Sequence, residues 1–259
     1  MRRPSPFDLT GKRAIVTGGG SGLGLQIAEG LAEAGCELAI CARNLERCEG
    51  AARHLAEQFG VRAIAQECDV RSADEIGAVV ATTAERLGGI EILVNNSGTS
   101  WSAPAIDYPL AAWEKVIAVN LTGTFRFTQA VAGWMIDHGA GGKVINIASV
   151  LGFRGAPAAR VDVVGYSASK GGVIAMTRDL AVKWAPQGIL VNAISPGWFQ
   201  TEMSADVLDR GRDSLLDRIP LGRFGGAEDL KAVAVFLAGP GSDFIVGQTI
   251  VVDGGQSVS

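Results

Sequence analysis

Seven short apolar runs, separated by longer segments with helical patterns, constrain the fold of this chain more than any other feature. The runs are rich in Val, Ile, Leu and Ala, and they lie at residues 13–18, 37–42, 61–66, 90–96, 142–149, 188–196 and 248–255. Most are apolar at nearly every position, which is typical of strands covered on both faces of a sheet. Helical patterns occur near residues 23–35, 45–59, 73–87, 110–137, 165–186 and 227–238.

This alternation of strand and helix predicts an α/β chain: a single-domain, doubly wound Rossmann fold with a roughly seven-stranded parallel sheet. No linker-like or repetitive stretch interrupts residues 1–259, so we expect one domain over this range. In such folds, ligands bind beyond the carboxyl ends of the strands. The residues that follow each strand are therefore the first candidates for a functional site.

The composition excludes several other kinds of function. The chain has 23 Lys and Arg against 27 Asp and Glu, and it contains no dense basic run. We therefore expect no nucleic-acid or membrane partner. The four cysteines form no CxxC pair and only two histidines could join them, so we expect no metal site. No apolar run is long enough to cross a bilayer, and we expect a cytoplasmic protein.

A glycine-rich turn, TGGGSGLG, connects the first predicted strand directly to the first predicted helix. Glycine at these positions permits a tight turn and close approach of the backbone to a pyrophosphate, while the helix N-terminus attracts negative charge. The turn therefore predicts a dinucleotide site. The residues expected to bind there are Thr17, Gly18, Gly20, Ser21, Gly22, Leu23 and Gly24.

The second predicted strand ends without a carboxylate, at Ala42, Arg43 and Asn44. An acidic residue at this end would bind the adenosine ribose and repel a 2′-phosphate. A guanidinium instead suits a phosphate. The pattern favours NADP(H) over NAD(H), with Arg43 and Asn44 as contacts. The glycine turn contains no basic residue, which keeps open the alternative that Arg43 is an ordinary solvated charge.

A tyrosine precedes a lysine by four residues in the stretch GYSASKGGV. On a helix, Tyr166 and Lys170 would lie one turn apart on the same face. A nearby cation favours the ionised form of a phenol, whose ordinary pKa is about 10. The pair is therefore either a proton donor with a charge that tunes it, or two polar residues on a surface helix.

Seven motifs occur in an order that decides between these alternatives: TGGGSGLG, CDV at 68–70, NNSG at 95–98, Asn120 in VNLTG, Ser149 in INIAS, YSASK at 166–170 and PGWFQT at 196–201. With them, the chain resembles the short-chain dehydrogenase/reductase (SDR) family over essentially its whole length. More loosely, it resembles the gluconate 5-dehydrogenase-like and 3-oxoacyl-ACP reductase-like branch.

The resemblance implies an oxidoreductase that interconverts an alcohol and a ketone by hydride transfer with NADP(H). Tyr166 would act as general acid/base, and Lys170 would contact the nicotinamide ribose and lower the pKa of Tyr166. Ser149 would bind the substrate oxygen, and Asn120 would hold a water for proton relay. Tyr166 is also expected to contact the cofactor, and further cofactor contacts are expected from Asp69, Val70, Asn96, Ser97, Gly98, Pro196, Gly197 and Thr201.

The resemblance also indicates where the substrate binds. A segment near 198–219 would cover it, and the candidate wall residues are Ser100, Trp101, Trp198 and Phe199. The stretch between Ser149 and Tyr166 is longer than is common in the family, and residues 158–164 would border the pocket.

Several alternatives remain open. The chain could be an NAD(H)-dependent sugar-acid or polyol dehydrogenase, a 3-oxoacyl thioester reductase, or a catalytically silent dinucleotide-binding protein. The helices near 110–137 and 165–186 resemble those that pair in oligomers of the family, so we expect a homotetramer or a homodimer.

Overall fold

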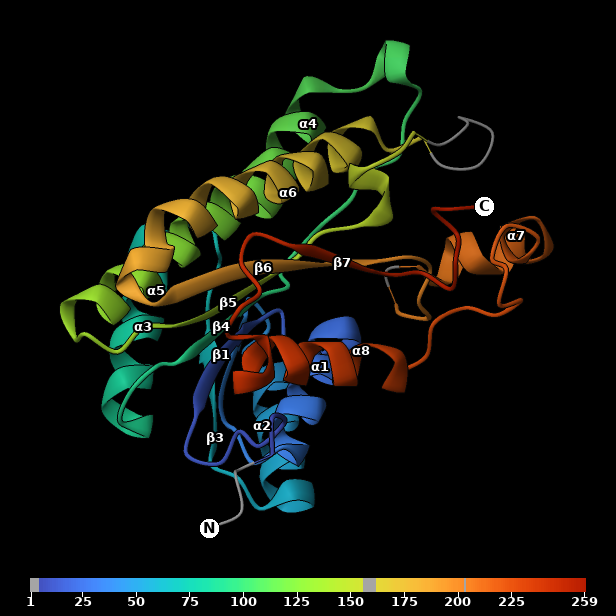
Figure 1. Ribbon diagram of the computed structural model, residues 1–259. Helices are drawn as coiled ribbons and strands as arrows, with labels where there is room; N and C mark the ends of the chain where they lie inside the picture. The colour runs from blue at the N-terminus through green and yellow to red at the C-terminus, as the bar shows by residue number, and fades with distance from the viewer. Residues whose placement is uncertain (1–4, 156–161, 203) are drawn as a thin grey trace.

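The computed structural model describes residues 5–155, 162–202 and 204–259, with backbone only for 206–210. Seven parallel strands form one sheet in the order β3-β2-β1-β4-β5-β6-β7 (Figure 1). They are β1 (Arg13–Thr17), β2 (Glu37–Ala42), β3 (Ala63–Glu67), β4 (Ile92–Asn95), β5 (Gly142–Ile147), β6 (Ile189–Pro196) and β7 (Thr249–Val252). This confirms the predicted fold class. The strand order reverses between β1 and β4, which is the point where such sheets bind ligands.

Helices cover both faces of the sheet (Figure 1). They are α1 (Gly22–Glu33), α2 (Leu45–Phe59), α3 (Ala73–Leu87), α4 (Leu110–Ile117), α5 (Thr124–Asp137), α6 (Val164–Trp184), α7 (Ala205–Leu216) and α8 (Glu228–Ala238). Helices α1, α2 and α8 contribute to the core on one face, and α3, α5 and α6 to the core on the other.

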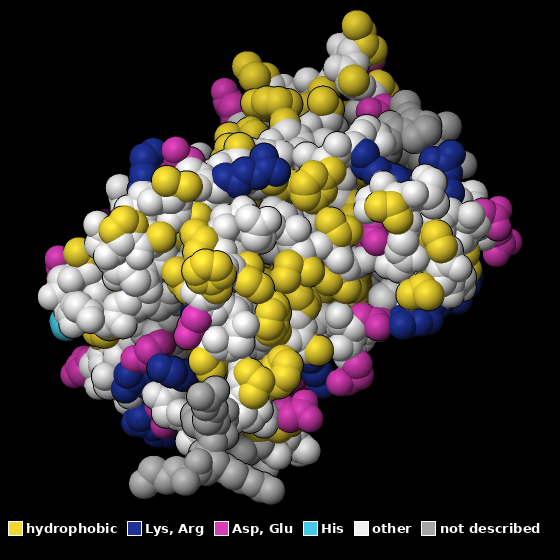
Figure 2. Space-filling view, in the orientation of Figure 1, with side chains coloured by type: hydrophobic (Ala, Val, Ile, Leu, Met, Phe, Trp, Pro, Cys, Tyr) yellow, Lys and Arg dark blue, Asp and Glu magenta, His cyan; other side chains and the backbone are white. Residues whose placement is uncertain are grey.

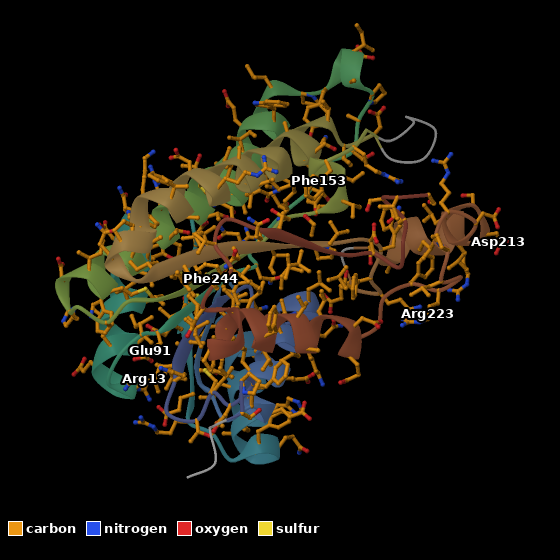
Figure 3. All side chains as sticks on the ribbon, viewed as in Figure 1. Arg13, Glu91, Phe153, Asp213, Arg223 and Phe244 are labelled. Carbon is orange, nitrogen blue, oxygen red and sulfur yellow. The ribbon has the colours of Figure 1, made fainter. Side chains whose placement is uncertain are left out.

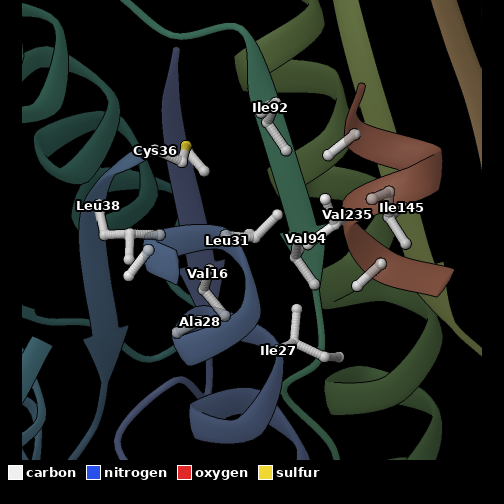
Figure 4. Close-up of a cluster of buried hydrophobic side chains, with 14 of the residues drawn as sticks. Val16, Ile27, Ala28, Leu31, Cys36, Leu38, Ile92, Val94, Ile145 and Val235 are labelled. Atoms are coloured by element: carbon white, nitrogen blue, oxygen red, sulfur yellow. The ribbon is translucent and has the colours of Figure 1, made fainter. Parts of the chain in front are cut away.

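The core explains why the strands are continuously apolar. Successive residues of a strand point to opposite faces, and both faces are buried. Val16 lies in the core beneath α1 and α8, whereas the preceding residue, Ile15, lies in the core beneath α3 and α5. Figure 4 shows Ile27 and Leu31 of α1 against strand residues of the core beneath α1 and α8.

Two elements differ from the sequence-based expectation. The single helix expected over 110–137 is interrupted by a π-helical turn at Ala118–Gly123, between α4 and α5. The segment expected to cover the substrate contains α7, which the apolar pattern did not predict because this helix is polar and distorted at Gly211 (φ −121°). In the described part of the chain, no helix is long and apolar enough to cross a membrane.

Candidate active site

A cleft of about 690 Å³ lies beyond the carboxyl ends of the strands. It is lined by most of the residues predicted from the sequence: Gly18, Gly20, Ser21, Gly22, Leu23, Arg43, Asn44, Asp69, Val70, Asn96, Ser97, Gly98, Ser149, Tyr166, Lys170, Pro196, Gly197 and Thr201. Of the remaining predicted residues, Thr17, Gly24 and Asn120 are buried next to the cleft and support its walls. The fold thus brings together residues from six strand ends.

The glycine turn is packed too tightly for side chains. A Cβ at Gly24 would lie 2.2 Å from the carbonyl oxygen of Gly18, and Gly18 itself has φ +64°. The hydroxyl of Thr17 accepts hydrogen bonds from the backbone N–H groups of Asn96 and Ser97, both at 3.0 Å. The Asn96 amide in turn donates to the Gly18 carbonyl at 3.1 Å. These contacts hold the turn against the end of β4.

Helix α1 leaves its N-terminal N–H groups available at this turn. Its N-cap, Ser21, makes no side-chain capping bond, and its first turn has no acidic residue. Helices α2 and α3 differ, because Asn44 and Ser72 cap them and acidic residues occupy their first turns. An uncapped helix N-terminus beside a bare backbone turn fits the pyrophosphate of a dinucleotide.

The adenosine end of the cleft carries more charge than the sequence reading anticipated. Arg43 is exposed and lines this end, as predicted. Four further charged residues line the cleft and were missed: Arg47, Arg71, Lys115 and Glu202. Arg71 donates to both carboxylate oxygens of Asp69, at 2.9 and 3.0 Å, and this contact lowers the pKa of Asp69 to about 2. Asp69 is therefore ionised and oriented by Arg71.

Helix α6 places Tyr166 and Lys170 on one face, as their spacing predicted. The Lys170 Nζ lies 5.6 Å from the centroid of the Tyr166 ring. Lys170 is only 4% exposed, and its ammonium donates to the backbone carbonyl of Ile147 at 2.6 Å. The end of β5 thus fixes the lysine beside the tyrosine.

Ser149 reaches the same site from the end of β5. Its hydroxyl oxygen accepts a hydrogen bond from the Leu151 N–H at 3.2 Å, which leaves the hydroxyl proton free to donate. The turn that follows lies directly on α6: a Cβ at Gly152 would come within 2.8 Å of the Lys170 backbone. Close packing at Gly152 therefore brings Ser149 to Tyr166.

Burial dominates the titration of the two helical residues. It raises the pKa of Tyr166 above its ordinary value of 10, with the Ser149 hydroxyl acting in the opposite direction. It also lowers the pKa of Lys170 to about 8. For Tyr166, removal from water outweighs the hydrogen bond to Ser149. The lowering of this pKa by the charge of Lys170 stays a prediction.

Asn120 lies in the π-helical turn between α4 and α5, and its side chain is bound within the protein. Its Oδ1 accepts from the Thr99 N–H at 2.8 Å, and its Nδ2 donates to the Thr99 carbonyl at 2.9 Å and to the Ser169 hydroxyl at 3.0 Å. It therefore links the loop after β4 to α6. The role of Asn120 in a water relay stays a prediction.

The structure does not bring the four candidate wall residues together in the cleft. Phe199 is 4% exposed and packs on Gly225, and Trp198 packs with Leu215 and Phe224. Ser100 and Trp101 are exposed beyond the cleft lining. Of the longer stretch at 158–164, which was expected to border the pocket, residues 158–161 lie outside the described residues.

Comparison with known proteins gives this geometry a family. A family model described as enoyl-(acyl carrier protein) reductase matches residues 18–257. The chain is 41% identical to a 2-dehydro-3-deoxy-D-gluconate 5-dehydrogenase of Escherichia coli strain K12, over 97% of each chain. It is 38% identical to a 3-oxoacyl-[acyl-carrier-protein] reductase of Aquifex aeolicus, over 96% of this chain and 98% of the relative. The chain belongs to the short-chain dehydrogenase/reductase family.

Among solved structures, the chain is similar to a gluconate 5-dehydrogenase from Burkholderia cenocepacia in complex with NADP and tartrate. The TM-score is 0.92 and the identity 39%, with 98% of each chain covered. The chain is thus an SDR oxidoreductase of the class that acts on CH–OH groups, and its cofactor is a nicotinamide dinucleotide.

Proposed function

We propose that this oxidoreductase uses NADP(H) to interconvert an alcohol and a ketone, with Tyr166 as the general acid/base. The observation that carries the proposal is the meeting of Ser149, Tyr166 and Lys170 at one end of a cleft whose other end is lined by Arg43. The dinucleotide supplies or accepts the hydride when bound. The residues of the chain position the substrate oxygen and move the proton.

In carbonyl reduction, the Tyr166 phenol donates its proton to the substrate oxygen. Burial raises the pKa of this phenol, so it is protonated near neutral pH and ready to act as an acid. The free proton of the Ser149 hydroxyl donates a hydrogen bond to the same oxygen, which stabilises the developing alkoxide charge. These two donors favour reduction as the reaction at neutral pH.

Lys170 supplies a fixed positive charge next to the phenol. Its ammonium is held by the Ile147 carbonyl and stays protonated below its pKa of about 8. Gly98 borders this ammonium and the side chain of Asn120: its Cβ position lies 3.9 Å from Lys170 Nζ and 3.6 Å from Asn120 Oδ1. The absence of a side chain at Gly98 leaves room between these two groups, where the relay water would bind.

Arg43 is the residue that supports NADP(H) rather than NAD(H). It lines the cleft just after β2, and this strand ends without the carboxylate that would bind the ribose and exclude a 2′-phosphate. The similar gluconate 5-dehydrogenase from Burkholderia cenocepacia was crystallised with NADP.

The test of the cofactor is a parallel titration of the wild type and Arg43→Ala with NADPH and NADH, followed by nicotinamide fluorescence. We expect NADPH to bind at least about tenfold more tightly than NADH, and Arg43→Ala to lose this gap. Equal binding of the two dinucleotides by the wild type would contradict the proposal.

The chain also offers surfaces for self-association, and we propose a homotetramer built from them. Hydrophobic side chains gather on the face in Figure 2, and Phe244, labelled on this face in Figure 3, is fully exposed. Among the described residues, β7 is the last strand of the sheet and has an unpaired edge, and Leu221, which bonds to the backbone just after β7, is 65% exposed. Sedimentation of the purified protein tests this; a monomer would contradict it, and a dimer would show that only one surface is used.

A further inference from the structure

Three arginines line the adenosine end of the cleft, and two of them are paired with carboxylates. Arg71 is bound to Asp69. Arg47, in the first turn of α2, donates from Nη1 to the Glu202 carboxylate at 2.8 Å. Glu202 belongs to the segment after β6, on the opposite side of the glycine turn. The Arg47–Glu202 pair thus spans the cleft.

Arg47 is packed directly against the glycine turn. A Cβ at Gly20 would lie 3.3 Å from the Cβ of Arg47. The backbone N–H of Arg47 donates to the Asn44 side chain at 2.9 Å, which fixes the first turn of α2 next to Arg43. The glycine turn itself has no basic residue. Arg47 therefore places a guanidinium where the turn supplies none.

We propose that Arg47 is a second specificity-determining residue, which binds the 2′-phosphate of NADP(H) together with Arg43, and that Glu202 competes with the phosphate for it. The inference rests on the NADP(H) preference proposed above and extends it to residues outside the strand-end pattern. The 2′-phosphate is favoured over the pyrophosphate as the target because Arg47 lies just after β2, beside Asn44 and Arg43, where the strand-end rule places the adenosine ribose. The pyrophosphate belongs instead at the N-terminus of α1.

The exchange of partners is physically easy. The side chains of Arg47 and Glu202 are 52% and 71% exposed, and an ion pair in such a setting contributes little to stability. A phosphate offers a guanidinium two charge-assisted hydrogen bonds and about twice the charge of a carboxylate. Glu202 also approaches the turn from the other side, because its neighbour Thr201 lies 3.6 Å from the Cβ position of Gly22. Its carboxylate would repel a phosphate bound at Arg47.

The test uses two ligands that differ only in the 2′-phosphate, adenosine 2′,5′-bisphosphate and adenosine 5′-monophosphate, titrated by calorimetry. Arg47→Gln should weaken binding of the bisphosphate about tenfold and leave the monophosphate unchanged. Glu202→Gln should strengthen binding of the bisphosphate about threefold, again without changing the monophosphate. NADPH and NADH should follow the same pattern.

A matched control is Arg53→Gln, which removes the same charge from an exposed site on α2 that does not line the cleft. It should bind both ligands as the wild type does, and thermal unfolding of each variant verifies that α2 remains folded. Equal weakening of both ligands by Arg47→Gln would overturn the proposal and assign Arg47 to the pyrophosphate. No change in either would overturn it as well.

Two results separate this proposal from the one on which it rests. If Arg43→Ala loses the preference for the 2′-phosphate and Arg47→Gln keeps it, the assignment of Arg47 is wrong and the NADP(H) preference stands. If the wild type binds the bisphosphate and the monophosphate equally, the NADP(H) preference itself is wrong.

Discussion

At the catalytic end of the cleft, Lys170 is 4% exposed, and its ammonium donates to a backbone carbonyl. At the adenosine end, Arg43 is exposed, and the side chains of Arg47 and Glu202 are 52% and 71% exposed. The first charge is positioned by buried secondary structure. At the adenosine end, Arg47 and Glu202 are held by their surface ion pair, and Arg43 has no ion pair with another described residue.

The difference separates two kinds of effect. A charge held by burial changes the chemistry of its neighbour, because the low dielectric of the interior strengthens its field and shifts pKa values. An exposed charge is screened, and its main use is to discriminate between ligands. We therefore expect substitutions at the catalytic end to reduce turnover and to alter stability, and substitutions at the adenosine end to alter cofactor choice.

The largest effect should come from Tyr166→Phe. Loss of the only phenol in the cleft lining removes the proton donor, so the turnover rate should fall about 10³-fold. The Kd for NADPH should change far less than the turnover rate, because only the hydroxyl of one contact residue is removed. The measurement is NADPH consumption with a keto-sugar acid and a 3-oxoacyl thioester, starting with whichever the wild type reduces. Arg43→Ala should have the opposite effect: it should weaken the binding of NADPH and leave the turnover rate at saturating NADPH unchanged. If Tyr166→Phe retains full turnover, the assignment of catalysis to this end of the cleft is wrong.

The next effect is a dependence of stability on pH that belongs to Lys170. The folded protein releases the Lys170 proton at a pKa of about 8, whereas the unfolded chain keeps it up to about 10.5. Between these values the unfolded state binds more protons at Lys170, so the contribution of Lys170 to the free energy of unfolding should rise with pH. The rise should reach ~3 kcal/mol relative to Lys170→Met. Urea denaturation of the wild type and Lys170→Met between about pH 7 and about pH 10.5 measures this difference.

Tyr166→Phe, which retains Lys170, is the control for this titration. Below pH ~10, where the phenol is protonated in the folded and the unfolded state, it should show the same pH dependence of stability as the wild type if the ammonium is responsible. If the difference in the free energy of unfolding between the wild type and Lys170→Met does not change with pH, the lysine is hydrated in solution. The two ends of the cleft would then not differ in how their charges are held.

A smaller effect compares two asparagines, one at each end. Asn120→Ala leaves the Thr99 N–H, the Thr99 carbonyl and the Ser169 hydroxyl without their buried partner, and should cost ~2 kcal/mol in the free energy of unfolding. Asn44→Ala removes the exposed cap of α2 and should cost ~1 kcal/mol. Chemical denaturation measures both. Equal costs would contradict the view that only the catalytic end depends on buried polar contacts.

The contrast between the two ends also explains which parts of the site could be predicted from the sequence. The strands were recognisable because residues such as Ile15 and Val16 are buried on opposite faces. The pairing of Tyr166 with Lys170 follows from helical spacing alone. Positions after strands, such as Arg43 and Ser149, follow from the rule that ligands bind at the carboxyl edge of the sheet.

What the sequence did not reveal depends on contacts between distant segments. Arg47 and Glu202 are 155 positions apart, and neither has a local pattern that indicates the other. Phe199 is apolar and would suit a pocket wall as well as a core, so only the fold places it in the core. The pKa of Tyr166 depends on the balance between burial and the hydrogen bond to Ser149, which no spacing encodes.

The smallest effect is a response to salt that only the adenosine end should show. Because Arg43 and Arg47 are exposed, added salt should screen their attraction for the 2′-phosphate and weaken NADPH binding roughly fivefold between about 0.05 and 0.5 M NaCl. NADH lacks that phosphate, so its affinity should change less with salt. The affinity of Arg43→Ala for NADPH should also change less. Turnover at saturating NADPH should be nearly constant, because Lys170 is shielded from the ions by burial. Fluorescence titration and steady-state rates at each salt concentration measure the two quantities. A turnover rate that falls as steeply as NADPH affinity would show that the catalytic charges are also open to solvent.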